Sequence, residues 1–71
     1  MTKGRPYGEE VGARIRRALE VLTPEQKEVF LLRTEAELSF KAIASVVGCP
    51  LGTALGRMRD ALLKLREVLR P

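Results

Sequence analysis

The segment from Gly52 to Arg59 combines small, hydrogen-bonding and basic residues within about two helical turns. Gly52 and Gly56 allow close approach of the backbone, and Thr53 offers a hydroxyl group. Arg57 and Arg59 offer guanidinium groups. A helix that enters the major groove of DNA presents its N-terminal turns, where such residues contact bases and phosphates. The segment therefore predicts a helix end that contacts DNA.

The two glycines of this segment require an explanation, because each costs about 1 kcal/mol relative to alanine inside a helix. Close approach of the backbone to a ligand is the interpretation that we favour. In the alternative interpretation, Gly52 lies in the fraying first turn and Gly56 packs against another helix. Arg57 and Arg59 also have an alternative role, as solvated charges whose stems lie along the domain.

Two basic residues earlier in the chain are further candidates for DNA contact. Lys41 lies near the start of an expected helix, where backbone amides have no partner within the helix and favour a phosphate. Arg33 lies at the end of the helix before it. Each is alternatively an exposed helix charge. Asp60 would repel a nearby phosphate unless an arginine neutralises it or it meets a cytosine amino group.

Breaks in the apolar periodicity predict an all-α fold of four helices without a wing. A first amphipathic helix begins near Glu9 and stops at Thr23 and Pro24. Thr23 can cap the second helix, Pro24 suits its first position, and Gln26 completes a capping box. The second half of this helix, around Phe30, is apolar on nearly all sides, so we expect it to be the central buried helix.

A third helix of about two turns is expected between Ser39, its N-cap, and Gly48, which ends it. Pro50 prevents its continuation, so a fourth helix of about 18 residues runs from Leu51 to the C-terminus. Two helices joined by a short turn that contains glycine form a helix-turn-helix unit. The apolar stripe expected to pack the last helix consists of Leu51, Ala54, Leu55, Met58, Ala61, Leu62, Leu65 and Leu69.

The composition of the 71 residues excludes several kinds of site. Histidine is absent and Cys49, a turn residue, is the only cysteine, so a disulfide is impossible and a zinc site lacks ligands. We expect no metal, no other cofactor and no enzymatic activity, since no nucleophile has a base beside it. Without an apolar run of roughly 20 residues or a secretory signal, the sequence predicts a cytoplasmic protein with no membrane partner.

Positive charge gathers at the two ends of the chain. The net charge is +4 and the sequence pI is about 9.8, which suits a polyanionic partner. Residues 1–8 contain two glycines and a proline and are expected to be a flexible tail or the remnant of a linker. Residues 9–71 are expected to form the domain. The first helix should carry a solvated basic face made of Arg14, Arg16 and Arg17.

Three segments resemble one known family in their order and spacing. They are residues 23–33 (TPEQKEVFLLR), 38–44 (LSFKAIA) and 47–53 (VGCPLGT). Over about residues 15–69 the chain looks like region 4 of the extracytoplasmic-function sigma factors. This resemblance implies a domain whose last helix recognises the −35 element of a promoter. It also implies an apolar surface that grips the flap of the RNA polymerase β subunit.

One stretch departs from the commonest form of this family. That form has lysine or arginine followed by serine where this chain has Leu55 and Gly56, and further basic residues near Asp60, Leu62 and Leu63. Because fewer phosphates are neutralised, we expect weak intrinsic affinity for DNA. Such sigma factors also carry a region 2, which has no counterpart here, so the chain is expected to be a fragment or a free-standing region 4.

Other functions stay open at this point. A protein-binding module of the same fold would be held by an anti-sigma factor, or act only on the polymerase, without touching DNA. Leu55 and Leu63 would extend an apolar patch for it. An unrelated helix-turn-helix regulator would bind DNA as a dimer, whereas region 4 acts as one copy, so we expect a monomer.

Overall fold

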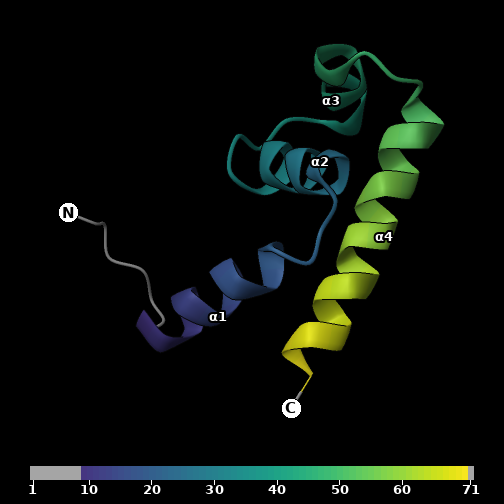
Figure 1. Cartoon of the computed structure of the whole chain (residues 1–71). Coiled ribbons are helices and arrows are strands. Elements are labelled where there is room, and N and C mark those ends of the chain that lie inside the picture. Colours follow the sequence, from purple (N-terminus) through teal and green to yellow (C-terminus); the bar gives the residue numbers. More distant parts are fainter. Residues whose placement is uncertain (1–8, 71) are drawn as a thin grey trace.

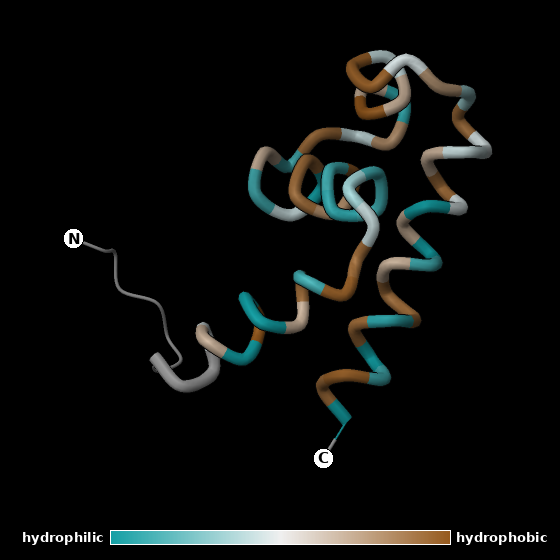
Figure 2. Tube along the Cα trace, in the orientation of Figure 1, coloured by the Kyte–Doolittle hydropathy of each residue, from teal (hydrophilic) through white to brown (hydrophobic). Residues whose placement is uncertain are grey.

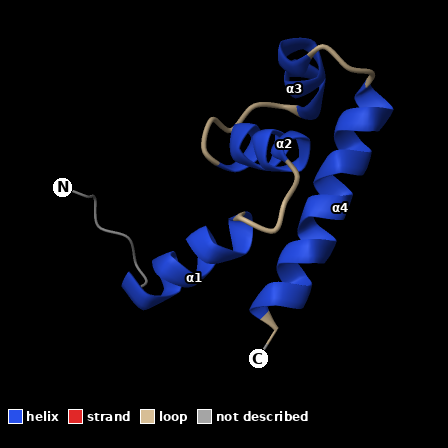
Figure 3. Cartoon of the chain, in the orientation of Figure 1, coloured by secondary structure: helices blue, strands red, loops and turns tan. Residues whose placement is uncertain are grey.

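The computed structural model describes residues 9–70, which form four helices and no strand (Figure 1). These are α1 (Glu9–Leu19), α2 (Pro24–Thr34), α3 (Phe40–Val47) and α4 (Leu51–Leu69). Figure 3 shows them joined by short loops. The predicted all-α fold with a C-terminal helix-turn-helix is confirmed. The expected tail, residues 1–8, lies outside the described residues.

The helices α2, α3 and α4 begin at the local signals that predicted them. The first helix, expected to stop at Thr23, ends earlier, at Leu19, because the amides of residues 20–22 bond to carbonyls three residues back and form a turn. At the start of α2, the Thr23 hydroxyl accepts a hydrogen bond from the Gln26 amide at 3.1 Å. The Gln26 side chain accepts one from the Thr23 amide at 3.2 Å, which completes the capping box. At the start of α3, the Ser39 hydroxyl accepts from the Ala42 amide at 3.1 Å. Gly48 ends α3 with φ of 75°, a conformation that glycine adopts without strain.

The longest helix, α4, is the common packing partner, since α1, α2 and α3 all pack against it. Figure 1 shows α3 beside its N-terminal end and α1 beside its C-terminal end. The core has two clusters, and Phe30 packs against both. The first joins α2, α3 and the first half of α4 and consists of Val29, Ile43, Ala44, Ala54 and Met58. The second joins α1, the turn after it and the second half of α4 and consists of Ala18, Leu22, Ala61 and Leu65.

The expectation that α2 is the central buried helix is wrong in its second half. Val29 is fully buried, but Phe30, Leu31 and Leu32 are only half-buried. The reason is that α2 packs mainly against α3 and α4, and no other element of the described chain covers its remaining surface. The centre of the domain is the line along which the other helices meet α4.

The apolar stripe predicted for α4 is also wider than the stripe that packs. Leu51, Leu55 and Leu62 were expected in the core, but they are 46%, 44% and 48% exposed. Figure 2 shows hydrophobic and hydrophilic residues alternating along this helix. The buried residues of the stripe that does pack are Ala54, Met58, Ala61 and Leu65.

None of the described helices is long and apolar enough to cross a membrane.

Candidate nucleic-acid interface

The turn between α3 and α4 is anchored to the end of α3 and to the core. The amides of Gly48 and Cys49 donate hydrogen bonds to the carbonyl oxygen of Ala44, at 2.9 and 3.0 Å. Cys49 is half-buried and packs against the first core cluster. The turn therefore holds the N-terminal end of α4 at a defined position beside α3.

The first turn of α4 presents backbone amides to solvent. Its N-cap is Pro50, which makes no side-chain capping bond, and the Pro50 carbonyl accepts from the amides of Thr53 and Ala54. The amides of Leu51 and Gly52 come earlier, in the turn where helical amides lack an intrahelical partner. Leu51, Gly52 and Thr53 are all exposed. This positive end of the helix dipole suits a phosphate or another anion.

The glycines of α4 leave an open strip of backbone on the surface of the helix. A Cβ atom added at Gly52 or Gly56 would meet no heavy atom within 4 Å. The alternative interpretation, in which Gly56 packs against another helix, is therefore wrong. No neighbour among the described residues needs the space beside these glycines, so it is available to a ligand that approaches the backbone closely.

Arg57 and Arg59 lie on different sides of that strip. Two residues along a helix correspond to a rotation of about 200°, so their side chains leave α4 on opposite sides. Arg57 is half-buried, whereas the side chain of Arg59 is 74% exposed and its Nε lies 3.7 Å from Oδ1 of Asp60. Such an exposed ion pair is weak, so Arg59 stays available to a phosphate. Arg59 also partly neutralises Asp60, whose negative charge would otherwise repel a nearby phosphate of DNA.

The two outer candidates differ in what already holds them. Lys41 is exposed in the first turn of α3. Arg33 is exposed too, but its Nη1 donates to the carbonyl of Leu38 at 2.9 Å and its guanidinium lies 5.2 Å from the centre of the Phe40 ring. Arg33 thus stabilises the loop between α2 and α3, a role that sequence reasoning missed. Phe40 was the available signal, but the course of the loop, with Glu37 at φ of 57°, decides the contact.

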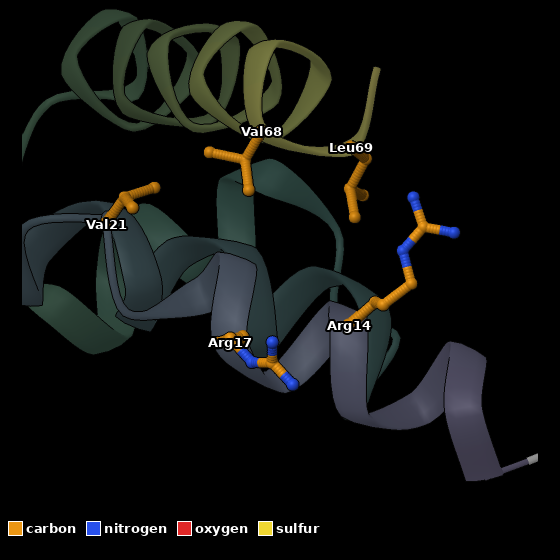
Figure 4. Close-up of a pocket in the computed structure, with 5 residues that line it drawn as sticks. All are labelled: Arg14, Arg17, Val21, Val68 and Leu69. Carbon is orange, nitrogen blue, oxygen red and sulfur yellow. The ribbon is translucent and has the colours of Figure 1, made fainter. Parts of the chain in front are cut away.

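A groove that the sequence did not predict lies between α1 and the C-terminal end of α4 (Figure 4). It has a volume of about 340 Å³. Arg14 and Arg17 are exposed, as expected, but they also line this groove. Exposed Val21 and Val68 and half-buried Leu69 complete the lining, so the groove offers apolar contact beside two positive charges. The lining residues are Arg14, Arg17, Val21, Val68 and Leu69.

Comparison with known proteins decides the family. The chain matches the family described as sigma-70, region 4 over residues 12–68. It belongs to that family. No match was found among the curated proteins. Region 4 is a DNA-binding domain of sigma factors, with a role in promoter recognition during transcription initiation, and it is not a known enzyme family.

The region 4 match covers most of the described structure. It begins in α1 at Gly12 and ends in α4 at Val68, so it includes α3, the turn after it and all of α4 except Leu69. Both surfaces described above, the N-terminal turns of α4 and most of the groove lining, lie within the matched residues. The two surfaces are at opposite ends of α4 (Figure 1).

Proposed function

We propose that this region 4 domain recognises the promoter −35 element by placing the N-terminal turns of α4 in the major groove of DNA. The observation that carries the proposal is the open strip of backbone at Gly52 and Gly56, next to exposed Thr53. Glycines with free space around them weaken a helix and add nothing to its packing, so a close-lying ligand accounts for them. The extracytoplasmic-function subtype suggested by the sequence is part of this proposal.

Arg57 and Arg59 are proposed to contact the two phosphate backbones that border the groove. The major groove is about 12 Å wide, close to the diameter of a helix with its side chains. Side chains that leave α4 on opposite sides therefore point toward opposite walls of the groove. The strip between them offers Thr53 and exposed Asp60 for base contacts, and Asp60 can accept from a cytosine amino group.

Lys41 and the free amides at the start of α3 are proposed to hold a further phosphate. Arg33 is an exposed residue and is proposed as a further contact, although its guanidinium also contacts Leu38 and Phe40. Contacts of this kind set the position and orientation of the domain on DNA and carry no direct information about base sequence.

The groove between α1 and α4 is proposed to hold the flap of the polymerase β subunit. Its apolar lining, with Val21 and Val68 exposed, gives a partner helix or loop a place to bury side chains. We call the N-terminal turns of α4, residues 51–59, the recognition turns. Because the groove and the recognition turns are at opposite ends of α4, one domain can contact polymerase and DNA at once.

The isolated domain should bind −35 DNA weakly, because few basic residues flank the open strip. We expect affinity near the roughly 10⁻⁴–10⁻⁶ M of non-specific binders. Attachment to the polymerase then raises the effective concentration of the helix at its site.

A titration tests this function. The chain is titrated against −35 and scrambled duplexes at physiological salt, and the titration is repeated with polymerase and a full-length factor that carries this domain. Sequence preference should emerge with polymerase and be lost in Val68→Ser, which alters the groove. Val46→Ser, an exposed apolar control on α3, should keep it. Nanomolar, sequence-specific binding by the isolated chain would overturn the proposal of a weak binder.

A protein-binding module that does not touch DNA is the second candidate function. The exposure of Leu55 and Leu63 on α4 favours it, as the sequence suggested. This candidate would be selected if the domain binds polymerase but shows no preference for the −35 duplex, either as the isolated chain or in the full-length factor with polymerase. An anti-sigma factor would be its natural partner.

A further inference from the structure

Four residues of α4 form a row in which leucine and arginine alternate. Leu55, Arg59, Leu62 and Arg66 follow one another at spacings of four, three and four residues, which places them on one face of the helix. All four are exposed. We call them the leucine–arginine row. At 100° per residue, the row lies between the packed stripe of α4 and the open strip at Gly52 and Gly56.

The leucines of this row belong to a longer apolar pattern. Spacings of four and three residues alternate along α4, which is the heptad pattern of helices that pair side by side. Met58 and Leu65 of this pattern are buried in the domain itself, whereas Leu55 and Leu62 stay exposed. Within residues 9–70, the domain thus covers one edge of the heptad seam and leaves the other edge without a partner. The full pattern is Leu51, Leu55, Met58, Leu62, Leu65 and Leu69.

We propose that the leucine–arginine row binds an acidic amphipathic helix of a second protein. Leucines of that helix would cover Leu55 and Leu62, and its carboxylates would pair with Arg59 and Arg66. The row contains no acidic residue of its own. A partner that carries glutamate or aspartate at the flanking heptad positions therefore matches both its apolar and its charged groups.

A second copy of this chain fits the row poorly. Two rows placed antiparallel would bring the arginines of both helices together, and like charges at flanking heptad positions oppose pairing. Asp60 and Glu67 lie outside the row. Asp60 forms only a weak, exposed ion pair with Arg59 at 3.7 Å, and Glu67 pairs with Arg70 at 3.5 Å. Arg59 belongs to both the row and the proposed DNA interface, so a bound helix would also remove one phosphate contact.

A designed peptide tests the row without DNA, so the outcome is independent of the proposed −35 recognition. The probe is a synthetic helix of three heptads with leucine at positions a and d and glutamate at e and g. The comparison peptide has lysine in place of glutamate. Titration calorimetry with the 71-residue chain should show at least tenfold tighter binding of the glutamate peptide. The double variant Arg59→Glu/Arg66→Glu should reverse this preference.

Matched variants locate the binding face. Leu55→Ser/Leu62→Ser should weaken binding of the glutamate peptide at least tenfold. Val46→Ser should leave it unchanged, because Val46 is also exposed, at 62%, but belongs to α3 and not to the row. These side chains are exposed, so the melting temperatures should stay near that of the unaltered chain. Backbone amide shifts of the unaltered chain on peptide addition should also concentrate between residues 55 and 66, whether or not a variant folds.

Three results would overturn the proposal. The first is equal affinity for the two peptides. The second is that Arg14→Glu/Arg17→Glu loses peptide binding while the row variants keep it. This result would place the peptide in the groove between α1 and α4. The third is a dimer of the chain in sedimentation experiments that Leu55→Ser/Leu62→Ser dissociates, because the occupant of the row would then be a second copy.

Discussion

Replacing Gly56 with alanine separates the stability of α4 from its proposed role in DNA binding. Gly56 lies in the interior of a 19-residue helix, and an added Cβ meets no heavy atom within 4 Å. Alanine in a helix interior is more stable than glycine by about 0.5–1 kcal/mol. For a domain of this size, that gain should raise the melting temperature by about 2–8 °C.

The same substitution should weaken DNA binding. If bases or sugars approach the open strip of α4, the methyl group of Ala at this position occupies the space that they need. We expect about tenfold weaker binding to a −35 duplex, which corresponds to about 1.4 kcal/mol. This loss is measured by fluorescence anisotropy of a labelled −35 duplex with the full-length factor bound to polymerase, since specific binding is expected only in that complex. Thermal circular dichroism of the 71-residue chain measures the gain in stability.

Gly12→Ala in α1 is the matched control. Its added Cβ would lie 3.6 Å from Nη1 of Arg16, an ordinary van der Waals contact, and α1 packs at the other end of α4. This variant should fold and bind DNA like the unaltered chain. A Gly56→Ala variant that melts higher and binds DNA unchanged would refute close approach at the strip. A lower melting temperature would contradict the finding that a Cβ atom at position 56 has free space around it.

Three further predictions concern the proposed contacts and the fold. Arg57→Ala and Arg59→Ala should each weaken DNA binding and lower the slope of log affinity against log salt by about one; unchanged affinity in both would favour the protein-binding module. Val29→Ala should lower the free energy of unfolding in urea by about 2–3 kcal/mol, and Leu32→Ala, which is only half-buried, by about 1–2 kcal/mol. Losses below about 1 kcal/mol at both sites would contradict the packing of α2. Gly48→Ala should cost about 1–2 kcal/mol, because φ of 75° strains alanine, and an unchanged thermal midpoint would argue against the left-handed turn.

The helix boundaries were predictable from sequence because short-range chemistry decides them. The Thr23 hydroxyl and the Gln26 side chain satisfy amides only three residues apart, and each can act before any tertiary contact forms. Gly48 ends α3 because its own backbone tolerates a positive φ. Interactions between residues this close in the chain can be recognised in the sequence from residue type and spacing.

Burial along α4 was less predictable. Periodicity identifies apolar residues on one side of a helix, but the width of the covered surface depends on what packs there. The helices opposite α4 have 11, 11 and 8 residues, and they cover a narrow stripe. Leu51, Leu55 and Leu62 fall just outside that stripe and stay exposed.

Only part of the candidate site could be predicted from the sequence. Glycine, threonine and arginine between residues 52 and 59 predicted DNA contact at the N-terminal turns of α4 from residue type alone, and this contact stays a prediction. The groove between α1 and α4 had no sequence signal, because Arg17 and Val68 come together only through tertiary packing. The stacking of Arg33 on Phe40 depends in the same way on the path of a loop.

The division of the core into two clusters along one continuous helix has a geometric consequence. The 19 residues of α4 span about 28 Å, at about 1.5 Å per residue, from the recognition turns to the groove. One residue inserted between Met58 and Ala61 would lengthen this span by about 1.5 Å and rotate one cluster against the other by about 100°. Under the proposed function, the length and phase of α4 set both the distance and the angle at which polymerase presents the domain to DNA. The preferred distance between the −35 element and the site where polymerase sits on the promoter is then set by helix register. This distance should change with insertions in α4 that leave every contacting residue intact.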